Sequence, residues 1–178
     1  MNENSVIQEL LVKAWEMRRV GNYDDARHIV KEAQRLCNDY DYNSLGRIFH
    51  IKMQFESDHR RLSKALELCK KSLINYKKSN NLNKIAHSTR HLADLERHLG
   101  KEDDSENNYR VAIDIYKNNP NTSNGDLANA LRGFGLLLEK RRKIKEAIAV
   151  WKETKDLYQA CNLQAGVDEA NNRLGLLA

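Results

Sequence analysis

One short pattern recurs four times along the chain, and it restricts the possible folds more than any other feature of the sequence. Each copy places a small residue near the start of a helical segment that follows a turn. These small residues are spaced by 39, 40 and 42 residues, and they are Ala26, Ala65, Ser105 and Ala147. Repeats of roughly 20 to 50 residues are typical of solenoids, in which similar structural units stack along one direction.

The residues that follow each small position indicate how the repeats would pack. A larger side chain comes four residues later, at Val30, Cys69, Tyr109 and Trp151. The small residue lets two helices approach closely, and the larger one fills the space between neighbouring repeats. Because one helix hairpin cannot cover its own apolar faces, the hairpins must stack to bury them. We therefore predict that Trp151 lies in the core.

Helical periodicity dominates the whole chain. Apolar residues recur at intervals of three and four, for example at Leu92, Leu95 and Leu99, which is the pattern of an amphipathic helix. No segment shows the sustained alternation that is typical of a strand. Turn-like breaks, such as Val20–Asn22 and Asn118–Asn124, divide the chain into about nine helices.

Length and cysteine content limit what can stabilise the fold. A chain of 178 residues can bury a substantial core without a disulfide or metal staple, so we predict one domain over residues 1–178. The three cysteines, Cys37, Cys69 and Cys161, are an odd number without a Cys-x-x-Cys pair. That arrangement argues against a disulfide framework and against a cysteine zinc site. We interpret them as reduced, mostly buried thiols.

Two features of the sequence bear on location. Its start, from Met1 to Val6, lacks the basic segment and apolar run of a secretory signal peptide. No stretch approaches the roughly 18 consecutive apolar residues that a membrane-spanning helix needs. We therefore expect a cytoplasmic protein that does not enter a membrane.

The charge pattern and the missing motifs narrow the function. The formal net charge is +5 and the pI is near 9.1, yet acidic and basic residues alternate along the chain. The basic run 140–143 is typical of a solvated helix end, because no aromatic residues interleave with it, and nucleic acid is not expected as a partner. The sequence contains no phosphate-binding loop, no nucleophile elbow and no His-Glu-x-x-His pair, so we predict that it is not an enzyme.

The repeats resemble the tetratricopeptide repeat (TPR) family over nearly the whole chain. The resemblance rests on the turn glycines Gly21 and Gly100, on the Ala positions of the second helices, and on residues near the middle of each first helix. The latter are Ala14, Met53, Ala93 and Gly135. The last two repeats look closest to the longer bacterial type. The second repeat departs most, with Met53 where a small residue is usual and Arg60 in place of the turn glycine.

The resemblance implies a fold and a binding surface. The fold would be an all-α, right-handed α-solenoid of stacked antiparallel helix hairpins, with about four repeats and a C-terminal capping helix. The first helix of each hairpin would line a concave face on which ligands usually lie. The residues that we expect to bind a partner there are Trp15, Arg18, Arg47, His50, His87, Arg90, Asp94, Arg97, Asn129, Arg132 and Lys140.

The predicted groove is rich in arginine, which indicates the chemistry of the partner. Guanidinium forks suit carboxylates, so we predict a scaffold or adaptor that binds an acidic peptide or protein segment. The alternative is that these positions are only the solvated sides of long helices, although we expect Arg90 and Arg132 to be exposed. Trp15 would either stack on the bound peptide or pack against the next repeat, and the sequence leaves both open.

Four residues of one helix have ligand-like chemistry, namely His87, His91, Asp94 and His98. Their spacings of four, three and four place them on one helix face, but they span about 16 Å of helix axis and cannot all reach one ion. A metal site would need two of them and a residue of another helix, such as His50. Neighbouring arginines would repel a cation, so we predict no metal and no cofactor.

Two rival functions remain at this point. The chain could self-assemble into a homo-oligomer through exposed ends of the stack, which would be formed by Val6, Ile7, Leu10, Leu174, Leu176 and Leu177. A metal-dependent enzyme that uses His87 and His91 is the less favoured rival.

Overall fold

The structure, a computed structural model, describes residues 3–178, and this range contains nine α-helices and no strand. The helices are α1 (Glu3–Arg19), α2 (Tyr23–Leu36), α3 (Tyr42–Asp58), α4 (Leu62–Lys78), α5 (Leu82–His98), α6 (Glu102–Asn118), α7 (Asn124–Lys140), α8 (Ile144–Ala160) and α9 (Gln164–Leu177). The all-α prediction and the predicted number of helices are confirmed for these residues. Met1 and Asn2, which entered the prediction about a signal peptide, lie outside the described range.

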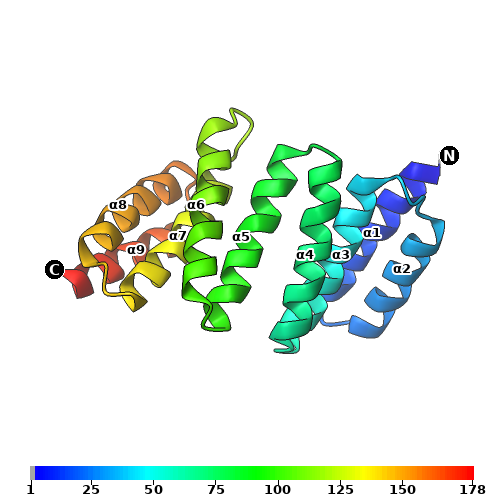
Figure 1. The fold of residues 1–178 in the computed structure, drawn as a ribbon, viewed down its shortest axis with the longest axis horizontal. Helices are drawn as coiled ribbons and strands as arrows, with labels where there is room; N and C mark the ends of the chain where they lie inside the picture. Colours follow the sequence, from blue (N-terminus) through cyan, green and yellow to red (C-terminus); the bar gives the residue numbers. More distant parts are fainter. Residues whose placement is uncertain (1–2) are drawn as a thin grey trace. The chain divides into compact units, whose positions relative to one another are not determined.

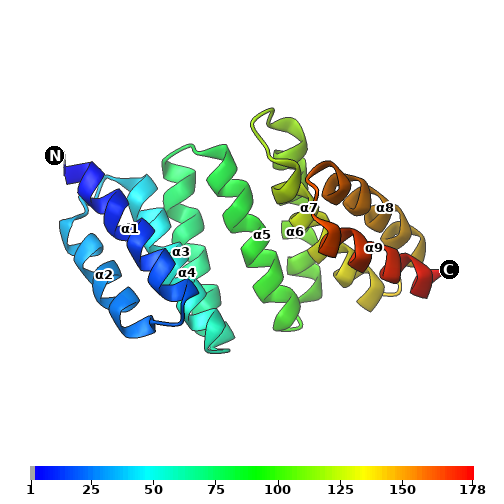
Figure 2. The ribbon, with the colours of Figure 1, turned by 180° about the vertical axis from the view of Figure 1, so that it is seen from behind.

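The chain divides into two compact units, Met1–Ser88 and Thr89–Ala178. We call them unit 1 and unit 2, and each is described by itself. Unit 1 holds α1 to α4 and the start of α5, whereas unit 2 holds the rest of α5 and α6 to α9. Consecutive helices pack as antiparallel hairpins, and Figures 1 and 2 show α1 beside α2 in unit 1 and α8 beside α9 in unit 2.

The turns after the first helices follow one backbone conformation. Gly21 and Gly100 have φ angles of 81° and 75°, and Arg60 and Arg142 take nearly the same conformation with φ of 57°. This left-handed region is where glycine is favoured at a helix C-terminus. Arg60 therefore ends α3 in the same way that Gly21 ends α1, although its side chain makes the turn more costly. The shared conformation fixes the register of the second repeat.

The repeated positions pack as the sequence predicts. Ala26, Ala65, Ser105 and Ala147 are fully buried, and so is Trp151, which confirms its core assignment. The hydroxyl of Ser105 donates a hydrogen bond of 2.8 Å to the carbonyl of Ala93, so the one polar member of this set is satisfied. Cys69 is buried as expected, but Cys37 and Cys161 are only half-buried, so the thiols are not mostly buried.

Aromatic side chains of the second helices lie against glycines of the neighbouring helices. Such contacts join Tyr76 to Gly46, Tyr109 to Gly133, Trp151 to Gly135 and Tyr158 to Gly166. At each of these glycines a Cβ atom would come within 3 Å of the aromatic side chain. The glycines therefore serve close packing here rather than a special backbone angle. None of the helices in residues 3–178 is both long enough and apolar enough to span a membrane.

Candidate functional site

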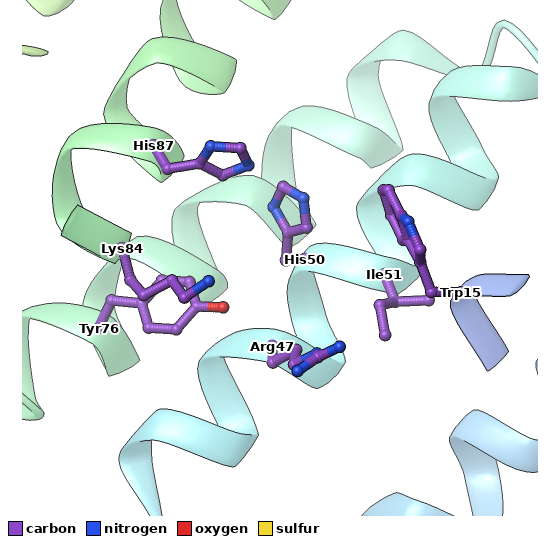
Figure 3. A pocket seen from close by; sticks show the side chains of 7 residues that line it. All are labelled: Trp15, Arg47, His50, Ile51, Tyr76, Lys84 and His87. Carbon is purple, nitrogen blue, oxygen red and sulfur yellow. The ribbon is translucent and has the colours of Figure 1, made fainter. Parts of the chain in front are cut away.

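A cavity of about 200 Å³ opens on the face of unit 1 that the first helices form. We call it the unit 1 cavity. Figure 3 shows its lining side chains, which come from α1, α3, α4 and α5. They are Trp15, Arg47, His50, Ile51, Tyr76, Lys84 and His87.

Helix α3 forms the floor of the cavity. Arg47, His50 and Ile51 recur at intervals of three and one, so they share one side of the helix. Gly46 lies on the neighbouring strip and leaves room for the ring of Tyr76, which would otherwise meet a Cβ atom at 2.5 Å. The hydroxyl of Ser72 also donates a 2.8 Å hydrogen bond to the carbonyl of Gly46 and ties α4 to α3. Close packing of α4 on α3 thus brings Tyr76 to the cavity.

Trp15 forms one wall of the cavity and also packs against the core of unit 1. Its ring centroid lies 6.1 Å from that of His50, and the Arg18 guanidinium lies 4.7 Å from the indole ring. Arg18 is held by two 2.7 Å hydrogen bonds to the carboxylate of Asp58 and one of 3.1 Å to Gln54. Trp15 therefore packs against the core of unit 1, while stacking on a bound peptide stays a prediction. Arg18 supports the indole with its own charge already paired.

Positive charge in the unit 1 cavity is not compensated by neighbouring acids. No carboxylate is among the lining side chains, and Arg47 and Lys84 have no ion pair with any side chain that the structure describes. The Arg47 guanidinium makes one long hydrogen bond of 3.4 Å to the amide oxygen of Gln8. Burial raises the pKa of Tyr76, against a smaller opposing effect of Arg47, so its phenol stays protonated and can donate.

Two histidines face each other across the cavity. The ring centroids of His50 on α3 and His87 on α5 are 5.0 Å apart, with their planes inclined by 53° (Figure 3). Imidazoles of two adjacent helices are a common beginning of a transition-metal site. Arg47 and Lys84 line the same cavity, however, and their charge opposes a cation. The electrostatics of the cavity favour an anion.

The other ligand-like residues of α5 are engaged with arginines in unit 2. Asp94 accepts a 2.5 Å hydrogen bond from the phenol of Tyr109 and a 3.0 Å hydrogen bond from Arg90. A second nitrogen of the Arg90 guanidinium lies 2.9 Å from the Nε2 atom of His91. The Arg90 guanidinium therefore lies beside both His91 and Asp94.

Arg97 and His98, at the end of α5, form a second internal contact of unit 2. The guanidinium of Arg97 donates to the phenol oxygen of Tyr109 at 3.3 Å and lies 3.3 Å from Nε2 of His98. Burial lowers the pKa of His98, and the charge of Arg97 lowers it further, while Asp94 has the opposite effect. Arg97 thus serves the packing of α5 on α6.

The arginines predicted to be exposed in unit 2 are only partly so. The side chain of Arg90 is 15% exposed, which corrects the expectation of an open position. Arg132 is more accessible, but its guanidinium makes two hydrogen bonds of 2.6 and 2.8 Å to the carboxylate of Glu169. Lys140 pairs with Glu102 at 2.9 Å. The basic residues predicted for unit 2 are therefore largely neutralised by acids of the same unit.

Basic residues that follow α7 also form ion pairs within unit 2. Arg141 and Lys143 form ion pairs of 2.9 and 2.7 Å with Glu106, a nearly buried carboxylate that also accepts from Arg110 at 2.8 Å. Burial alone would raise the pKa of Glu106, but the hydrogen bonds from Lys143 and Arg110 outweigh it and lower the pKa. This network ties α6 to the turn between α7 and α8.

Four of the eleven residues predicted to bind a partner line the unit 1 cavity, namely Trp15, Arg47, His50 and His87. Asn129 and Arg132 line a shallower, open pocket of unit 2, where Asn129 accepts a 2.9 Å hydrogen bond from the phenol of Tyr158. The prediction missed Tyr76 and Lys84. Lys84 precedes His87 by three residues, and this helical spacing places both on one side of α5.

The expected end face at the start of the chain is smaller than the sequence suggested. Ile7 is only 3% exposed because it belongs to the core of unit 1 with Leu11 and Ala14. Leu176 near the other terminus is 72% exposed. Self-assembly through an apolar end at Ile7 therefore loses one of the residues on which it was based.

Comparisons with known proteins identify the fold but not a family. No family model matches the sequence, and no curated protein matches it. Among solved structures, BtubC (BKLC) from P. vanneervenii is similar with a TM-score of 0.75 and 15% identity, over 98% of this chain and 80% of that chain. A putative kinesin light chain from Podosopora anserina, described as nearly identical TPR-like repeats, is similar with a TM-score of 0.67 and 11% identity. The similarity covers 99% of this chain and 97% of that chain.

These similarities show that the chain has a TPR-like repeat fold, as its repeats predicted. The identities are too low to carry more than the fold. Solenoids of this kind commonly bind other proteins along an extended surface.

Proposed function

We propose that this protein is a non-enzymatic adaptor that binds an acidic segment of another protein on the face of its first helices. The segment is bound mainly in the unit 1 cavity. A cytoplasmic location goes with the proposal, because three free cysteines are typical of a reducing compartment.

One observation carries the proposal, which is the uncompensated charge of Arg47 and Lys84 in a cavity without acids. Several other cations of the first helices, such as Arg18 and Arg132, already have carboxylate partners. A cation that lacks a partner within its own fold can pair with a carboxylate of a bound segment. Trp15 adds a rigid aromatic surface of the kind that anchors protein interfaces.

The experiment compares two double variants that remove the same charge. Arg47→Gln with Lys84→Gln neutralises the cavity, whereas Lys70→Gln with Lys77→Gln neutralises two exposed lysines on the outer side of α4. Proteins captured by the wild-type chain and by each variant are identified by mass spectrometry. The captured segment is then purified, and its affinity for all three chains is measured directly.

The proposal expects a partner that the outer-face variant retains and the cavity variant loses, with an acidic segment as the bound part. Circular dichroism and thermal melting check that both variants keep the fold. If the purified segment binds both variants equally well, the cavity is not the binding site.

A further inference from the structure

Apart from the two imidazoles and the phenol oxygen, the side chains that line the unit 1 cavity offer hydrogen-bond donors and no acceptors. Arg47 and Lys84 are permanent donors, and the phenol of Tyr76 stays protonated because burial raises its pKa. His50 and His87 add two imidazoles from opposite walls. The lining contains no carboxylate and no side-chain amide. A ligand group that satisfies this set must be an acceptor with several oxygens.

The donors surround the cavity rather than forming one flat fork. They come from α3, α4 and α5, with Trp15 of α1 closing another side (Figure 3). A carboxylate has two oxygens in one plane and is matched by a single guanidinium fork. A phosphate monoester has three terminal oxygens in a tetrahedral arrangement and carries about −1.5 to −2 charges near neutral pH. Its geometry and charge match two cations, on the half-buried Arg47 and the exposed Lys84, together with donors on several sides.

We propose that the unit 1 cavity recognises a phosphorylated serine or threonine within the bound segment. This inference rests on the proposed function, because it names the group of the partner that enters the same cavity. Arg47 and Lys84 bind the phosphate oxygens, and Tyr76 donates a further hydrogen bond. Trp15 and Ile51 give the apolar wall against which the adjoining residues of the segment lie.

The two tryptophans allow a direct test by nuclear magnetic resonance. Trp15 lines the cavity, whereas Trp151 is fully buried in unit 2 and hydrogen-bonds to Glu139. Their indole N–H signals are assigned with Trp15→Phe, and the Trp151 signal serves as the internal control for an intact fold. The full-length chain is titrated with four probes, which are inorganic phosphate and three degenerate heptapeptide pools with phosphoserine, glutamate or serine at the centre.

The proposal expects the phosphoserine pool to shift the Trp15 signal saturably and to leave Trp151 in place. The glutamate pool should bind at least about tenfold more weakly, and the serine pool should cause no saturable shift, because the charge-assisted hydrogen bonds are fewer or absent. Arg47→Gln and Lys84→Gln should each weaken the phosphoserine pool by about tenfold or more. Lys77→Gln, on the outer side of α4, is the matched control and should change the affinity less than about twofold.

Three outcomes overturn the inference in distinguishable ways. Equal binding of the glutamate and phosphoserine pools removes the phosphate but leaves the acidic segment of the proposed function. Inorganic phosphate that binds as tightly as the phosphoserine pool shows a site for a free anion rather than for a segment. If neither phosphoserine nor glutamate moves the Trp15 signal, both the inference and the role of the cavity in the proposed function fail.

Discussion

Gly46 is the position at which a single methyl group tests the packing that forms the cavity. A Cβ atom at this position would lie 2.5, 2.6 and 2.9 Å from Cδ1, Cε1 and Cγ of Tyr76. Carbon atoms in ordinary contact are about 3.5–4.0 Å apart, so the ring or helix α4 must move by roughly 1 Å. Neither moves freely, because Tyr76 is only 2% exposed and Ser72 ties α4 to the carbonyl of Gly46.

The magnitude follows from two opposing effects of Gly46→Ala. Overpacking of a tight site typically costs about 1–3 kcal/mol. Alanine in the middle of a helix is favoured over glycine by about 0.5–1 kcal/mol. We therefore expect a net loss of about 1–2 kcal/mol in the free energy of unfolding, measured from urea denaturation curves.

Two control variants make this prediction specific. Gly175→Ala, at a helical glycine with nothing within 4 Å of the added atom, should leave the free energy of unfolding unchanged or raise it by a few tenths of a kcal/mol. In a Tyr76→Leu background the ring is gone, so Gly46→Ala should no longer be destabilising. A Gly46→Ala protein as stable as wild type would refute the claim that this contact is tight.

The other predictions concern the turns and the buried network of unit 2. Gly100→Ala should destabilise by about 1 kcal/mol, because φ is 75° and no neighbour lies within 4 Å, so only the backbone conformation opposes the side chain. Arg142→Gly, at a φ of 57°, should leave stability unchanged or raise the melting temperature by relieving the same strain. Burial raises the pKa of Glu106, but Lys143 and Arg110 outweigh this effect and lower the pKa below 4.5. The stabilisation from the ionised carboxylate is therefore present above pH 4.5 and is lost as the pH falls through the pKa of the folded protein. Urea midpoints from pH 7 to pH 3 should show Glu106→Gln to be less stable at pH 7, with the difference narrowing in acid.

The sequence was sufficient to predict the parts of the fold that follow from local pattern. The repeated small residues marked the helix contacts, and the spacing of Ala147 and Trp151 placed the indole in the core. The turn at Arg60 was harder, because its left-handed conformation carries no glycine. Its alignment with Gly21 and Gly100 became secure only from the backbone angles.

The candidate site was predicted only in part, for reasons that involve distant contacts. Arg132 and Glu169 are 37 residues apart, so no spacing rule reveals that they neutralise each other. The same holds for Tyr76, which reaches the cavity because Gly46 on another helix leaves room for it. Lys84 could have been found from its helical spacing to His87. Helical register identifies which residues share a face, whereas ion pairing between helices determines which of their charges remain uncompensated.

The most direct test of the account is the affinity of the chain for a fluorescently labelled heptapeptide pool with central glutamate, measured by anisotropy in two salt concentrations. Neutralising the cavity with Arg47→Gln and Lys84→Gln should weaken binding by at least about tenfold. The Lys70→Gln and Lys77→Gln protein, which loses the same charge on the outer side of α4, should stay within about twofold of wild type. Equal losses in the two variants would show that binding depends on overall charge, and unchanged affinity in both would show that the unit 1 cavity does not bind the segment.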